Sequence, residues 1–233
     1  MNSSTVYWTN LRTTPNRTIL QKLDILCRTA GLSDLDIHDK FCALKIHFGE
    51  PGNMAFVRPP FIRVISAIIK ENGGKPFLTD ANTLYSGQRA TAFDHLRAAF
   101  GNGFSYDATG CDIIIADGLK GADYSELPVS AGIHCSSARI ACAIAEADAV
   151  ISINHFKGHE LTGFGGALKN LGMGCASRSG KKFLHDVSHP TIHRESCTGC
   201  GVCMTNCASK AIHLDSEHKA VIEHDICTGC CQC

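Results

Sequence analysis

The sequence lacks any long apolar run and any excess of charge of either sign. Its apolar runs fall short of the roughly 18 residues that a membrane-spanning helix needs. Lysine plus arginine and aspartate plus glutamate both number 22, so no overall field attracts nucleic acid or an anionic membrane. The first residues also lack the basic and apolar regions of a secretory signal. We therefore expect a cytoplasmic protein that binds neither nucleic acid nor membrane.

Cysteine, in contrast, is abundant, with 14 residues in a chain of 233. In a reducing cytoplasm, clustered thiols bind metal more often than they form disulfides. The cysteines that cluster most closely all follow residue 196, namely Cys197, Cys200, Cys203, Cys207, Cys227, Cys230, Cys231 and Cys233. The end of the chain is therefore the first candidate for a metal site.

The spacing of these cysteines is typical of bacterial two-cluster ferredoxins. A C-x2-C-x2-C-x3-C run begins at Cys197, and Cys227 starts the same run again with the same Thr-Gly pair. In such modules the fourth cysteine of a run ligates the other cluster. The pattern predicts one complete set of four thiolates for a 4Fe–4S cluster: Cys207, Cys227, Cys230 and Cys233. The second set, Cys197, Cys200 and Cys203, lacks its fourth ligand.

Several explanations of the missing ligand stay open. The sequence stops at Cys233, where the next cysteine of the repeat would follow, so the simplest explanation is a natural chain that continues further. A three-iron cluster, a ligand other than cysteine, or Cys231 are the others. Zinc and disulfides are disfavoured, because zinc modules rarely add a third cysteine at the same two-residue step.

Before this module, short apolar runs alternate with helical patterns. The expected strands are Thr5–Thr9, Phe41–Phe48, Pro76–Thr79, Asp112–Ala116 and Ala149–Ile153. The expected helices are Arg17–Ala30, Phe61–Asn72, Ala90–Phe100, Ala138–Ala147 and Gly166–Leu171. This alternation predicts an α/β fold whose sheet is mostly parallel, with helices on both faces. A hairpin or excursion is expected at Tyr124–Cys135, and Trp8 is expected to pack in the core or at an edge.

The predicted domain order has three parts. Residues 1–180 form the α/β domain, and residues 181–190 form a linker within the polar stretch Ser177–Ser196. Residues 191–233 form a small α+β module of the bacterial ferredoxin type. Its cysteine runs are joined by a predicted hairpin of Ala211–Leu214 and Ala220–Glu223.

Candidate catalytic residues in the α/β domain follow two expected strands. Ligands of open α/β sheets bind beyond the carboxyl ends of strands, where His155, Lys157 and His159 are predicted to lie. The two histidines could coordinate a metal, and the lysine could bind an anion or act as a base. Lys45 and His47, with Glu50, follow another strand and are expected to face the same cleft.

Other polar residues near these strands have simpler interpretations. Asp80, Asn82 and Thr83 are more typical of a cap and turn after a strand than of a ligand site. Lys169 and Asn170 could point into the cleft or lie on a solvated helix face. Cys27, Cys42, Cys111 and Cys142 fall in apolar patterns that favour core positions.

Three of these segments together resemble the domain of unknown function 362 family. They are Lys45–Glu50, Phe77–Tyr85 and His155–Ala176, and the resemblance covers essentially the whole chain. It implies an α/β domain fused to a two-cluster 4Fe–4S module, often called an Fe–S centre protein. It also implies a natural chain longer than this sequence, and it implies no particular reaction.

We therefore expect an electron-transfer protein whose 4Fe–4S clusters serve a reaction or an anionic ligand in the α/β cleft, and oxidoreductase is the enzyme class that this expectation favours. Its redox partner protein is not identified by the sequence. Two alternatives stay open. The α/β domain could only dock partners of a dedicated electron carrier, or it could be a non-redox, metal-assisted enzyme with structural or sensory clusters.

Overall fold

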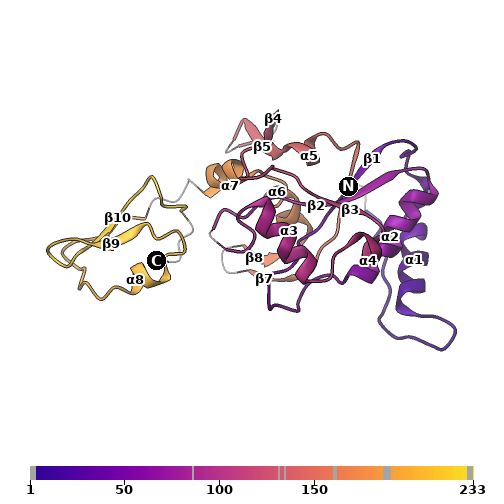
Figure 1. Cartoon of the computed structure of the whole chain (residues 1–233), viewed down its shortest axis with the longest axis horizontal. Helices are drawn as coiled ribbons and strands as arrows, with labels where there is room; N and C mark the ends of the chain where they lie inside the picture. Colours follow the sequence, from indigo (N-terminus) through magenta and orange to yellow (C-terminus); the bar gives the residue numbers. More distant parts are fainter. Residues whose placement is uncertain are drawn as a thin grey trace.

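The computed structural model describes residues 4–85, 87–130, 132–133, 135–159, 162–185, 190–229 and 233. An α/β domain occupies most of the chain, and a smaller C-terminal module follows residue 189 (Figure 1). None of the helices in these ranges is long and apolar enough to cross a membrane.

A four-stranded parallel sheet forms the centre of the α/β domain. Its strands in spatial order are β3 (Asp112–Ile115), β2 (Lys75–Asp80), β1 (Phe41–Lys45) and β6 (Ala149–Ser152). Lys45 at the end of β1 is in register with Thr79 of β2 and Ser152 of β6. The carboxyl ends of these strands therefore meet at one edge. The predicted α/β fold is confirmed, and each of these strands lies where the sequence predicted one.

The helices that precede β1 and β2 cover a well-packed core. α1 (Ile19–Thr29) begins with a capping box between Thr18 and Gln21, and η1 (Leu32–Asp34) follows it. α2 (Pro59–Glu71) starts with two prolines, which suit the first turn of a helix. It buries Ile62, Ile65 and Ile69 in the cluster that also contains Leu44 and Leu78 of the sheet. α3 (Ala92–Gly101) and α4 (Tyr106–Thr109) lie between β2 and β3 in the chain.

The second half of the domain contains two short hairpins. β4 (Tyr124–Pro128) pairs with β5 (Ser137–Ala141), which confirms the predicted excursion. β7 (Lys157–His159) pairs with β8 (Gly163–Gly165). α5 (Cys142–Ala145) follows β5, and α6 (Ala167–Gly172) follows β8.

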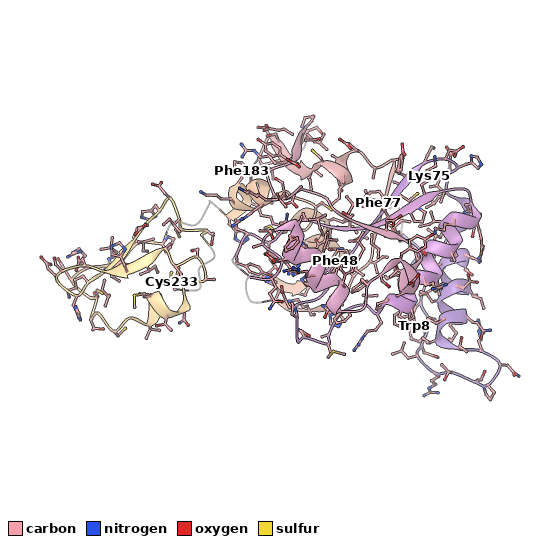
Figure 2. All side chains as sticks on the ribbon, viewed as in Figure 1. Trp8, Phe48, Lys75, Phe77, Phe183 and Cys233 are labelled. Atoms are coloured by element: carbon pink, nitrogen blue, oxygen red, sulfur yellow. The ribbon has the colours of Figure 1, made fainter. Side chains whose placement is uncertain are left out.

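Three local predictions were wrong. Thr5–Thr9 forms no strand, and Trp8 is 78% exposed (Figure 2). The expected helix Ala138–Ala147 is instead split between β5 and α5, because antiparallel pairing to β4 overrides local helix propensity. The unbroken apolar run Asp112–Ala116 is typical of a strand covered on both faces, but β3 lies at the edge of the sheet, and Ile114 is 44% exposed.

The predicted linker at residues 181–190 also needs correction. α7 (Arg178–His185) extends into it, and Lys181 on this helix is buried. Residues 186–189 lie outside the described part of the chain. The polar composition of this stretch suggested a linker, but the side chain of Lys181 lies inside the α/β domain rather than in solvent.

The C-terminal module contains a short helix and one hairpin. α8 (Val202–Asn206) precedes β9 (Ile212–Leu214), which pairs in antiparallel fashion with β10 (Ala220–Ile222). This confirms the predicted hairpin. Ala211, Ile212 and Ala220 are its buried apolar residues. Figure 1 shows the module beyond α7, apart from the sheet of the α/β domain.

Candidate functional site

A buried ion pair occupies the edge where β1 and β2 end. Lys45 is 1% exposed, and its Nζ lies 2.9 Å from Oδ1 of Asp80. Lys45 Nζ also donates to Oδ1 of Asn170 at 2.7 Å. A buried charge needs such partners, because its removal from water is costly. The predicted site residue Lys45 is therefore held inside the protein by Asp80 and Asn170.

Arg89 brings a further charge to Asp80, and the ring of His95 lies beside it. Arg89 Nη1 lies 3.3 Å from Asp80 Oδ2, and its Nε donates to Glu50 at 3.0 Å. His95 Nε2 lies 3.5 Å from the same oxygen, and no residue in the described ranges hydrogen-bonds either ring nitrogen of His95. Burial alone would raise the pKa of Asp80, but Lys45, His95 and Arg89 outweigh burial and hold it well below its usual range. Asp80 is therefore a carboxylate.

A second buried group joins β3 to α7. Asp117 Oδ1 accepts hydrogen bonds from the backbone and side-chain nitrogens of Asn82, both at 2.9 Å. Lys181 Nζ donates to the backbone oxygens of Asn82 at 2.9 Å and Ala176 at 2.8 Å. Burial raises the pKa of Asp117. The sequence interpretation of Asp80 and Asn82 as a simple cap and turn therefore missed their role in a buried polar network.

The pKa of Lys181 predicts how stability depends on pH. Burial lowers this pKa from 10.5 to about 8, although Asp80 and Asp117 oppose the shift. Between these values the unfolded chain binds more protons, so the free energy of unfolding should rise with pH, by up to about 3 kcal/mol. Urea unfolding from pH 7.5 to 10 measures this rise. In the Lys181→Met variant the free energy of unfolding should no longer rise over this pH range, whereas in the variant of the exposed neighbour, Lys182→Met, it should still rise. The same pH profile in both variants would contradict the lowered pKa of Lys181.

Asn170 connects the segment His155–Ala176 to the sheet. Its Nδ2 donates to the backbone oxygen of Lys45 at 3.2 Å and to Oγ of Ser152 at 3.1 Å. Gly174 allows this close approach, because a side chain there would clash with Asn170 O and Lys45 Nζ. Lys45 and Asn170 therefore join β1 to the segment His155–Ala176.

His47 lies near this network and in contact with solvent. Its side chain is exposed, and Nδ1 accepts the backbone N–H of Gly49 at 2.9 Å. The surrounding protein and then Arg89 lower the pKa of His47 to about 4. The ring is therefore neutral at pH 7 and able to accept a proton, as a general base must be.

The other predicted catalytic residues belong to the hairpin of β7 and β8 or to the segment before it. His155 and Lys157 are exposed and lie outside the buried network. His159 Nε2 contacts Lys169 Nζ of α6, and its Nδ1 accepts the backbone N–H of Thr162 at 3.4 Å. Because protein groups engage both ring nitrogens, the geometry does not support His159 as a metal ligand.

In the C-terminal module, the two cysteine runs form similar turns. Gly199 and Gly229, at equivalent positions of the runs, both have left-handed backbone, with φ of 68° and 64°. Backbone N–H groups donate to the sulfurs of Cys197, Cys207 and Cys227, at 3.4, 3.3 and 3.5 Å. Of these donors, Ala220 and Ala211 belong to the hairpin of β9 and β10 or border it, and Gly229 belongs to the second turn.

Hydrogen bonds also favour the thiolate forms of these cysteines. The N–H groups of Ala220 and Val202, respectively, are the largest influences that lower the pKa of Cys197 and of Cys200. Burial raises the pKa of Cys207, but bonds from Ser209 and nearby backbone outweigh it. In the ranges that the structure describes, no three metal-ligating side chains form one group. Cys230, like Cys231, lies outside those ranges, so the complete four-thiolate set cannot be assembled from them.

The structure also contains a groove remote from these residues. It has a volume of about 600 Å³ and lies between α1 and the first half of α2, beside Arg17, Asp24 and Arg63. It contains none of the predicted site residues. Of the cysteines expected in the core, Cys42 and Cys111 are buried there and Cys27 packs against it, whereas Cys142 is half-buried and outside the core clusters.

One comparison with known proteins identifies the family of this α/β protein. The model of the family described as domain of unknown function (DUF362) matches residues 42–223, which include the site in the α/β domain and most of the C-terminal module. The chain therefore belongs to the DUF362 family. No curated protein and no solved structure matches it.

Proposed function

We propose that this protein binds 4Fe–4S clusters through its C-terminal cysteines and exchanges electrons between them and a reaction in the α/β domain. The observation that carries the proposal is the repeated cysteine run at Cys197 and Cys227, whose spacing is specific to such clusters. The matching left-handed backbone of Gly199 and Gly229, at equivalent positions of the two runs, supports it.

The donor chemistry of the module fits this cofactor. Cluster potentials depend on hydrogen bonds to sulfur, and backbone N–H groups already donate to Cys197, Cys207 and Cys227. Cys207, Cys227, Cys230 and Cys233 would hold one cluster, and Cys197, Cys200 and Cys203 would contribute to a second. When bound, such clusters supply or accept one electron at a time.

The α/β domain would supply the reaction site. Its buried charges lie at the carboxyl edge of a parallel sheet, where ligands of such folds bind. His47, neutral and in contact with solvent beside them, would accept a proton. A small anionic molecule is the proposed ligand, because exposed Lys157 and half-buried Lys169 belong to the same region.

α7 supports coupling between this site and the cysteines. Lys181 on this helix donates to Asn82 O within the buried network. The next residue, Lys182, donates through Nζ to the backbone oxygen of Asp225 at 3.3 Å. Asp225 lies two residues before Cys227, so one turn of this helix contacts both the α/β site and the segment just before a predicted cluster ligand.

Anaerobic reconstitution with iron and sulfide tests the proposed function. Iron, acid-labile sulfide and zinc would be quantified per chain after removal of unbound metal. We expect about four iron atoms with equal sulfide from the complete set of thiolates, or about eight if another group completes the second set. Bound zinc without acid-labile sulfide would contradict the proposal.

A further inference from the structure

The amine of Lys169 is held firmly at the edge of the sheet where β1 and β6 end. Lys169 belongs to α6, and the adjacent Asn170 fixes this helix through hydrogen bonds to Lys45 and Ser152. The Lys169 side chain is half-buried and reaches the β7 hairpin, where its Nζ contacts Nε2 of His159. The amine therefore has a defined position close to the buried network.

The hydrogen bonds of His159 favour a neutral amine at Lys169. The backbone N–H of Thr162 donates to His159 Nδ1 at 3.4 Å. In the tautomer that this bond favours, the proton is on Nε2, the nitrogen that faces Lys169. An N–H group and an ammonium would repel each other, whereas a neutral amine accepts the hydrogen bond. This tautomer therefore favours the nucleophilic form of lysine.

Two other elements bring titratable groups close to this amine. Lys157 lies on β7 and repels the charged form of Lys169. His185 lies at the end of α7 and interacts electrostatically with Lys169. Partial burial, followed by Lys157, lowers the pKa of Lys169. Burial, followed by Lys169 and His159, lowers the pKa of His185. A lysine that is desolvated and beside another cation is activated as a nucleophile.

We propose that Lys169 is an amine nucleophile that forms a Schiff base with the carbonyl group of a small anionic compound of the 2-oxo acid class. The neutral amine adds to the carbonyl carbon, a proton moves from nitrogen to oxygen, and water leaves as the C=N bond forms. Lys157 attracts the carboxylate, and His159 lies within reach of the proton. This inference deepens the proposed function and rests on it only for the location of the site.

Reductive trapping of the full chain tests the proposal. Glyoxylate and sodium cyanoborohydride would be added at pH 7, and the initial labelling of each lysine would be followed by peptide mass spectrometry. Each unit by which a pKa is lowered gives about tenfold more free amine at this pH. Lys169 should therefore label severalfold faster than exposed Lys182 and Lys210. Labelling of Lys169 at or below their rate would overturn the proposal.

Two comparisons separate the nucleophile from its anionic ligand. Formaldehyde, a neutral carbonyl compound, should also label Lys169 first, but with a smaller preference than glyoxylate. Lys157→Gln should reduce the preference for glyoxylate severalfold, and Lys75→Gln, an exposed lysine on β2, should not. An unchanged preference in Lys157→Gln would overturn the assignment of an anionic ligand.

The trapping result and the cluster result are independent. Labelling requires no iron, so it would be measured before and after reconstitution. A chain that binds iron and sulfide but leaves Lys169 unreactive would overturn this inference alone. A chain with reactive Lys169 that binds neither would overturn the proposed function and leave the Schiff-base proposal supported.

Discussion

Replacing Asp80 with alanine is expected to lower the free energy of unfolding by about 3–5 kcal/mol, because it leaves buried cations without their counter-ion. Lys45 Nζ lies 2.9 Å from Asp80, Arg89 lies 3.3 Å away, and both cations are at most 3% exposed. Asn170 and Glu50 would remain as partners, but neither replaces the carboxylate between the two cations. Urea unfolding at pH 7 measures the loss.

Asp36→Ala is the matched control for this substitution. Asp36 also pairs with a lysine, Lys40, at 2.6 Å, but the aspartate side chain is 89% exposed. A solvent-exposed pair of this kind contributes little to stability, because water and salt screen it. A loss in Asp80→Ala no larger than in Asp36→Ala would mean that the buried network does not stabilise the domain.

Single cysteine substitutions are expected to affect iron binding unequally. Cys227→Ala removes a member of the complete thiolate set, so reconstituted iron should fall from about four atoms per chain to near zero. Cys200→Ala changes only the set that lacks its fourth cysteine and should leave about four. Iron and sulfide analysis after anaerobic reconstitution measures both.

Cys142→Ala is the control for the loss of a thiol elsewhere. Cys142 is half-buried at the start of α5 in the α/β domain, and iron content should not change in this variant. Equal iron in Cys227→Ala and Cys200→Ala would contradict the assignment of Cys207, Cys227, Cys230 and Cys233 to one cluster.

The sheet and the repeated cysteine turns could be predicted from sequence because their signals are local. β1, β2, β3 and β6 are short apolar segments bounded by turns, and α2 carries an apolar stripe after two prolines. The cysteine run needs only its own spacing. Lys45 could also be selected, since it follows a strand whose carboxyl end faces a ligand site.

The composition of the buried network could not be predicted in the same way. Arg89 and His95 meet Asp80 through a loop and α3, and no periodicity marks these contacts. Lys181 belongs to a polar stretch whose composition is typical of a linker. Its Nζ nevertheless donates a hydrogen bond to the backbone oxygen of Asn82, 99 positions away in the sequence. His155 and Lys157, chosen for their chemistry, instead lie on the solvated side of their segment.

Electron paramagnetic resonance of the reconstituted full chain tests the central claim most directly. Spectra would be recorded anaerobically before reduction, after dithionite and after reoxidation, together with iron and sulfide contents. We predict that the reduced protein gives the signal of a paramagnetic 4Fe–4S cluster, which disappears on reoxidation. A chain with iron and sulfide bound but no reducible signal would contradict electron transfer through this module.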